Sequence, residues 1–116
     1  MDLNDARFHS EILSISTANP GWQVHVQHLY TDPGQRGAEV GEESWHAIAA
    51  WALVKRIRAD GSEQTETEPV FVDANSLINA TEYRRLHSDL DPDPGQPKIR
   101  VRIAIKPPTG PEEEVS

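Results

Sequence analysis

The chain has 116 residues, no cysteine and a formal net charge of −8, from 19 acidic and 11 basic residues. This length suits one domain with one hydrophobic core, and the absence of cysteine excludes disulfides and thiolate metal sites. An acidic surface repels nucleic acids and anionic membranes unless basic residues gather on one face.

Targeting signals are not apparent. The N-terminus lacks the apolar core of a secretory signal, and no apolar run approaches the roughly 20 residues that span a membrane. Arginine outnumbers lysine by eight to three and there are nine prolines, a balance typical of a GC-rich bacterial genome. We therefore expect a cytoplasmic bacterial protein without membrane contact.

The first two predicted strands span residues 8–17 and 22–30. The first carries apolar residues on both faces, which a bulge near Ile12 would reconcile. The second alternates cleanly between apolar and polar residues from Trp22 onward. Because an Asn-Pro-Gly turn signal separates them, we expect these strands to pair as a hairpin.

Residues 31–43 predict a loop, because they contain three glycines, one proline and four acidic residues. The loop is longer than most connections in compact domains, and we expect it to be mobile. Its glycine spacing does not match a phosphate-binding loop.

The central stretch predicts a long β-hairpin with strands at about 45–59 and 62–73. Asp60-Gly61 between them is typical of a two-residue type I′ turn. In that register, opposite charges meet near the tip and apolar residues meet near the base, which a helix would not predict. The alternative is a helix over 44–58, because acidic residues precede that segment and basic residues end it; the fold would then be α+β.

This hairpin register specifies cross-strand pairs whose residue numbers sum to 121. Lys55 then lies opposite Glu66, and Arg58 lies opposite Glu63. An exposed ion pair stabilises by only about 0.2–1 kcal/mol, so these pairs specify the register more than they stabilise the fold.

A short helix is predicted from Thr81, which can cap it, to Leu86. Basic residues in its second half suit the helix dipole. Residues 89–97 contain three prolines and predict a stiff connector without regular structure.

The cleanest predicted strand is 98–106, in which apolar residues alternate with basic ones. Two prolines end it, and residues 107–116 predict a disordered acidic tail. We therefore predict one globular domain over residues 1–106. The predicted fold class is mainly β, a small five-stranded antiparallel barrel or rolled sheet with one short helix.

The histidines and aspartates do not predict a metal site. His25 and His28 point to opposite faces of a regular strand, so they cannot share an ion. Residues 89–93 resemble the opening of a calcium loop, but Pro94 stands where glycine is needed and Arg100 where a bidentate glutamate is needed. No catalytic set is recognisable either. We expect no metal, no cofactor and no enzymatic activity.

Charged residues of the hairpin and the last strand form the one segregated charge feature. A nucleic-acid interpretation would place the basic residues against phosphates, but acidic residues are equally abundant nearby and the chain is acidic overall. The predicted interaction surface therefore combines both signs: Lys55, Arg56, Arg58, Glu63, Glu66, Arg100 and Arg102.

The function that these features predict is a non-enzymatic protein–protein interaction module, either a homodimer or a subunit of a larger assembly. Three tryptophans, a protruding hairpin and a strong strand near a sheet edge motivate it. Two alternatives stay open. One is a ligand-binding or catalytic barrel with loop 31–43 over a pocket beside Trp22 or Trp45. The other is nucleic-acid binding through strand 98–106.

Overall fold

The computed structural model describes residues 8–115, which form seven strands and one helix. In chain order these are β1 (Phe8–Thr17), β2 (Gln23–Thr31), β3 (Glu39–Arg58), β4 (Glu63–Asp73), β5 (Ser76–Asn79), α1 (Ala80–His87), β6 (Lys98–Lys106) and β7 (Glu113–Glu114).

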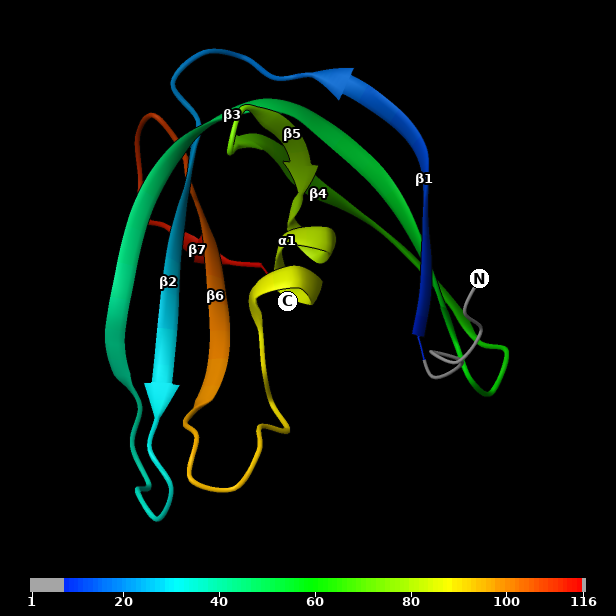
Figure 1. The fold of residues 1–116 in the computed structure, drawn as a ribbon. Coiled ribbons are helices and arrows are strands. Elements are labelled where there is room, and N and C mark those ends of the chain that lie inside the picture. The colour runs from blue at the N-terminus through cyan, green and yellow to red at the C-terminus, as the bar shows by residue number, and fades with distance from the viewer. Residues whose placement is uncertain (1–7, 116) are drawn as a thin grey trace.

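All described strands belong to one sheet with the order β5-β4-β3-β2-β6-β7, and β1 lies beside β3 outside this path. The sheet curls around α1 and stays open on one side, so it forms a half-barrel (Figure 1). The mainly β prediction with one short helix is confirmed. The five-stranded count is wrong, because β5 and β7 extend the sheet. Of the two predicted forms, the curled open sheet agrees with the rolled sheet, and the barrel is not closed.

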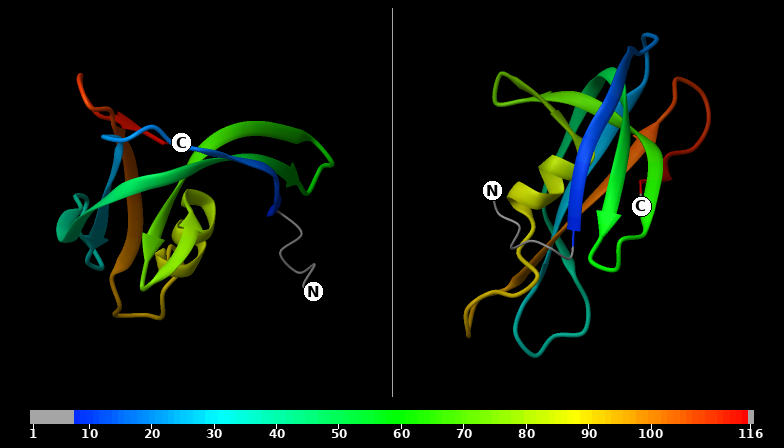
Figure 2. Two further views of the ribbon diagram at one scale, coloured as in Figure 1. Left: turned by 90° about the horizontal axis from the view of Figure 1, so that it is seen from above. Right: turned by 90° about the vertical axis from the view of Figure 1, so that its right-hand side faces the viewer.

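The twenty-residue strand β3 divides this sheet into two parts. Its residues 39–47 pair with β2, which pairs in turn with β6, and we call these strands the wall. Its residues 50–58 pair with β1 on one edge and with residues 63–70 of β4 on the other. We call this second part the arm, and Figure 2 shows its tip projecting away from the wall.

The predicted hairpin between the first two strands is wrong. Both β1 and β2 run antiparallel to β3, along successive halves of it, with Thr17 opposite Ala50 and Gln23 opposite Ala47. The turn signal therefore marks a corner rather than a reversal, and Trp22 packs edge-on against Trp51 there, with ring centroids 5.6 Å apart. The predicted bulge near Ile12 is confirmed by a register shift directly after that residue.

The strand interpretation of the central stretch is confirmed, and the helix alternative over 44–58 is wrong. The strand begins earlier than predicted, at Glu39, because the second half of the predicted loop 31–43 pairs with β2.

The predicted turn and register at the arm tip are also wrong. Arg58 and Ser62 close a three-residue turn through their backbones, with Gly61 at a positive φ of 86°. This type I turn with a glycine bulge is also common in hairpins, and it places Lys55 opposite Thr65 rather than Glu66. Asp60 supports the turn by accepting hydrogen bonds from the amide and hydroxyl of Ser62, which lower the pKa of its carboxyl.

The hydrophobic core lies between the concave face of the sheet and α1. Its buried members come from the wall, from β4 and from α1: Val24, Val26, Ile48, Phe71, Ala80, Tyr83, Val101 and Ile103. The predicted inward face of strand 98–106 is confirmed at Val101 and Ile103. Burying a side chain of this size stabilises the fold by about 1.5–3 kcal/mol.

Helix α1 is capped from a distant strand rather than by Thr81. The N-cap residue is Asn79, whose side chain makes no capping bond. Instead the fully buried Glu68 of β4 accepts hydrogen bonds from the amide of Thr81 at 2.8 Å and from its hydroxyl at 2.6 Å. Thr81 therefore lies inside the first turn, and the helix ends at His87, one residue after the predicted end.

The segment predicted as a disordered tail contains a short strand. Strand β7 pairs with the edge of β6, and the amide of Val115 donates to the carbonyl of Ile103 at 2.8 Å. Val115 also packs against the core. The acidic residues of this segment find basic partners on β6, which the local composition could not indicate.

Candidate functional site

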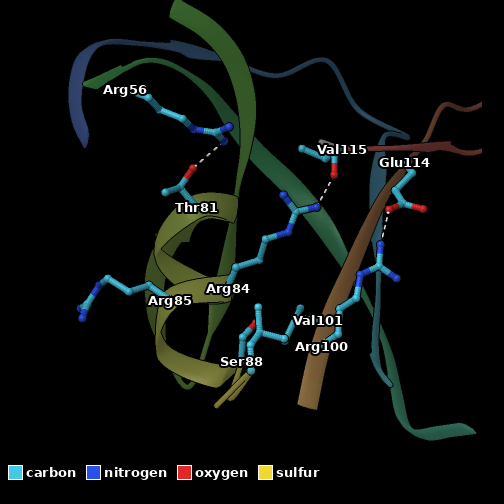
Figure 3. Close-up of a pocket in the computed structure, with 10 residues that line it drawn as sticks. Arg56, Thr81, Arg84, Arg85, Ser88, Arg100, Val101, Glu114 and Val115 are labelled. Carbon is cyan, nitrogen blue, oxygen red and sulfur yellow. Dashed lines mark hydrogen bonds and ion pairs between the residues drawn. The ribbon is translucent and has the colours of Figure 1, made fainter. Parts of the chain in front are cut away.

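An open cavity of about 490 Å³ lies between α1, β6 and the C-terminal segment. This volume falls in the range of roughly 300–1,000 Å³ that is usual for ligand pockets. Four of its lining residues are arginines and one is acidic (Figure 3): Arg56, Thr81, Arg84, Arg85, Ser88, Leu90, Arg100, Val101, Glu114 and Val115.

Three separate elements bring the arginines together. Arg84 and Arg85 lie in the last turn of α1, where the helix dipole favours cations. Arg100 alternates along β6 with the core residue Val101. Arg56 reaches the cavity from the arm. The curl of the sheet around α1 therefore creates the site.

Arg56 is fixed in a network at the base of the arm. Its guanidinium pairs with Glu66 and with Glu68, the latter at 3.2 Å, and donates to the hydroxyl of Thr81 at 2.9 Å. Its Nε is buried and has no hydrogen-bond partner among residues 8–115. Leaving a buried donor unsatisfied costs about 1–3 kcal/mol, which the surrounding network offsets.

Burial and neighbouring charges affect the ionisation of Arg84. Burial lowers the pKa of its guanidinium, and the positive charges of Arg56 and Arg100 lower it further, while Glu68 and Glu114 act in the opposite direction. The guanidinium also donates a hydrogen bond to the carbonyl oxygen of Val115.

The outer rim of the cavity is an ion-pair ladder between β6 and the C-terminal segment. Glu114 accepts from Arg100 at 2.9 Å and from Arg102 at 3.1 Å, and Arg102 lies 3.6 Å from Glu112. These side chains are between one-quarter and three-fifths exposed, so each pair stabilises the fold only weakly.

A buried histidine anchors the same segment to the outer face of the wall. Nδ1 of His25 lies 2.9 Å from the carboxylate of Glu112, and its Nε2 contacts Glu43. The ring stacks on Trp45 with centroids 4.0 Å apart. The hydrogen bond from His25 is the main reason that the pKa of Glu112 is lowered.

The inner face of the wall carries a second aromatic cluster. Nε2 of His28 lies 2.8 Å from the hydroxyl of Tyr83, which stacks on His87. Burial, together with Asp73 and Glu42, raises the pKa of Tyr83 to about 12. The side chains of His25 and His28 lie on opposite faces of the sheet, as predicted: His25 stacks on Trp45 and His28 packs against Tyr83. Among residues 8–115 there is no group of three histidines or acidic residues that could hold a metal ion.

The structure brings only two of the seven predicted interaction residues into the cavity, Arg56 and Arg100. Lys55 pairs with Glu63 at 3.5 Å nearer the tip of the arm, where Arg58 donates to a glutamine. Glu66 holds Arg56 in place, and Arg102 belongs to the outer rim.

Sequence reasoning missed the two arginines of α1 and the C-terminal residues. The adjacent cations Arg84-Arg85 are a signal in the sequence, but a basic pair near a helix end also suits the helix dipole, so the pattern alone does not indicate a cavity. A second cavity of about 340 Å³ lies beside the loop after β2. It is lined by residues 31–35 and 91–96 with Lys98, and by neither Trp22 nor Trp45.

Comparisons with protein-family models, curated proteins and solved structures found no match. Within the described part of the chain, no helix has both the length and the apolar character needed to cross a membrane.

Proposed function

We propose that this protein is a non-enzymatic interaction module that binds an acidic group of a partner protein in the arginine-lined cavity. The observation that carries this proposal is that four arginines from three elements line one open cavity. The guanidinium of Arg85 pairs with Glu82, so those of Arg56, Arg84 and Arg100 are the ones nearest the opening. Guanidinium groups bind carboxylates through paired, charge-assisted hydrogen bonds and are preferred at such interfaces. Their convergence is unexpected in a chain with a net charge of −8.

The chemistry of the lining supports binding rather than catalysis. Arginine stays protonated, so it can position an anion but cannot act as a general base. The hydroxyl of Thr81 is engaged, since it donates to Glu68 and accepts from Arg56. The carboxylate that lines the cavity, Glu114, is paired with Arg100.

Calorimetric titration of the full chain with a short acidic peptide tests the proposal. The probe is the acetylated, amidated peptide Ser-Glu-Glu-Glu-Thr, and the same peptide with glutamines is its neutral control. A charge-assisted hydrogen bond contributes about 1.5–3 kcal/mol, so we expect Arg100→Gln to weaken binding about tenfold or more.

Arg36→Gln is the matched control variant, because Arg36 is exposed in the loop after β2 and does not line the cavity. It should bind the acidic peptide as the native chain does. Equal affinity of the native chain for the acidic and neutral peptides would contradict the proposal, as would equal weakening by both arginine substitutions.

A further inference from the structure

The strand β1 has one edge without a neighbour. It pairs with β3 along its other edge, and no residue among 8–115 pairs with the second one, which we call the outer edge. Every side chain from Glu11 to Thr17 is exposed, including those of Ile12, Leu13 and Ile15. Proteins usually protect such an edge with lysine or proline, and β1 contains neither. The outer edge therefore offers a template for another strand.

The backbone hydrogen bonds at the arm tip show which residues of β1 face outward. Arg58 donates to Ser62 and accepts from Gly61, so its backbone groups point to β4. Successive residues of a strand point to alternate edges, and the pairing of β3 with β4 is regular over residues 50–57. The odd-numbered residues of this part of β3 therefore point to β1, where their partners are His9, Glu11, Ser14 and Ser16. The residues of β1 that point to the outer edge are Ser10, Ile12, Ile15 and Thr17.

We propose that a second copy of this chain pairs with the outer edge of β1, antiparallel and about a two-fold axis, so that the two arms form one continuous sheet. In a symmetric antiparallel pair, the residue numbers of opposed residues have a constant sum. Only a sum of 27 sets all four outward-facing residues opposite one another, with Ile12 opposite Ile15 of the second copy and Ser10 opposite its Thr17. These pairs would exchange about eight backbone hydrogen bonds, two for each pair.

The bulge in β1 fits this register. A bulge usually protects an edge strand, because it disturbs the spacing of the backbone groups. The register shift lies between Ile12 and Ser14, so Leu13 is the extra residue. The two-fold axis would pass between Leu13 and Ser14, which places the two bulges opposite each other and leaves the strands in register on both sides.

The apolar side chains along this edge are complementary to those of a second copy. Ile12 lies opposite Val54 of β3. Ile15 lies opposite Ala52, and both of these β3 residues belong to the small buried cluster of the arm. Pairing would place Ile12 beside Ile15 of the second copy, because directly opposed side chains lie together. The buried clusters of the two arms would then join across the axis.

The one charged residue between positions 11 and 17 does not oppose this pairing. Glu11 pairs with Lys55 at 3.4 Å within its own chain, and it would lie opposite Ser16 of the second copy. Two carboxylates therefore do not face each other across the edge. The net charge of −8 on each copy acts at longer range and is screened at physiological salt.

The size of the contact sets the expected affinity. With one strand from each copy, the buried area falls in the class of small, transient interfaces, below about 1,200 Å². We therefore expect a dissociation constant of about 10–100 μM. Residues 11–17 do not line the arginine-lined cavity, so the dimer goes beyond the proposed function and does not depend on it.

Sedimentation velocity of the full chain, from about 5 to 500 μM at physiological salt, tests the dimer. Two variants carry the same new charge at neighbouring exposed positions. Ile15→Lys would place its charge against Ile12 of the second copy, and we expect it to weaken the dimer about tenfold or more. Ser16→Lys is the matched control, because its charge would lie opposite Glu11 of the second copy. Its dimer should be at least as strong as that of the native chain.

Cysteine cross-linking tests the register, since the native chain has no cysteine. Glu11 and Ser16 of the two copies would form a non-hydrogen-bonded pair with Cα atoms about 4.5 Å apart, which a disulfide can span. A mixture of Glu11→Cys and Ser16→Cys chains should therefore oxidise mainly to the mixed dimer. Each variant alone should cross-link far more slowly, because identical positions would lie more than about 10 Å apart along the strands.

Three results would overturn the proposal. The first is a chain that stays monomeric up to about 500 μM. The second is a dimer that both lysine substitutions weaken equally, or that neither affects, because its interface would then lie elsewhere. The third is cross-linking of identical positions as fast as that of the mixed pair, which would contradict the register.

Discussion

In the wall, α1 covers the inner face of the sheet and residues such as Val24 and Val26 are fully buried. In the arm, the strand β1 leaves Ile12 and Leu13 each 48% exposed and Ile15 61% exposed. Both regions share the strand β3, so the difference comes from what covers each half of it. The wall is stabilised by the larger apolar core, and the arm by a smaller buried cluster of Ala52, Val54 and Val70 together with strand pairing and exposed charge.

The junction between the wall and the arm contains a buried polar network centred on Glu68. Glu68 comes from the arm side, is fully buried, and joins Arg56 to the first turn of α1. It thereby fixes the helix that carries Arg84 and Arg85 against β4 and against the part of β3 that carries Arg56. The arginine-lined cavity lies at this junction, where the two regions meet.

The largest expected difference between the wall and the arm is in the free energy of unfolding that is lost when one apolar side chain is truncated. Phe71 is fully buried and packs on Tyr83, with ring centroids 5.5 Å apart, so Phe71→Ala should lower the free energy of unfolding by about 3–5 kcal/mol. Ile15→Ala in the arm should lower it by less than about 1 kcal/mol. Urea unfolding measures both, and similar losses would show that the exposed apolar side chains of β1 stabilise the fold as much as the larger core does.

Removing the charge of Glu68 should have the next largest effect. Glu68→Gln weakens the contacts to Arg56 and Thr81 within a buried site, and hydrogen bonds to charged groups are worth about 1.5–3 kcal/mol. We expect a loss of about 2–3 kcal/mol in the free energy of unfolding. Glu63→Gln, at an exposed pair in the arm, is the matched control and should change it by less than about 1 kcal/mol. Comparable losses in the two variants would contradict the role of the junction.

The contact between Glu112 and His25 should have the smallest effect and a characteristic pH dependence. Because the pKa of Glu112 is below its ordinary 4.5 in the folded protein, its contribution to stability is fully present above that value. The contribution is lost as the pH falls through the folded pKa. The difference in melting temperature between the native chain and Glu112→Gln should therefore be present at pH 6 and shrink below about pH 4.5. A difference that grows on acidification would contradict the contact.

Local sequence patterns predicted the positions of most strands, but they did not predict which strands pair or in which register. The alternation along β2 and β6 placed their inward faces correctly, because one face of each packs on the core. The Asn-Pro-Gly signal located the corner before Trp22 but could not give its direction, since β3 is long enough to pair with both β1 and β2. Asp60-Gly61 suits two turn types, and the one-residue difference between them changed the register of the arm.

The site could be predicted only in part, for a similar reason. Arg56 and Arg100 belonged to the predicted surface because their charges are segregated along strands. Arg84 joins them only through the curl of the sheet around α1, which depends on long-range packing. Val115 gave no signal as a single apolar residue among acids, yet its burial brings the acidic segment onto β6.

The central claim, that the arginine-lined cavity binds an acidic segment, is tested most directly by an NMR titration of the full chain with the Ser-Glu-Glu-Glu-Thr peptide. We expect saturable chemical-shift changes at the amides of Arg84, Arg100 and Val101 and at their side chains, and no change near the tip of the arm. Changes confined to the arm, or equal changes with the neutral peptide, would contradict it.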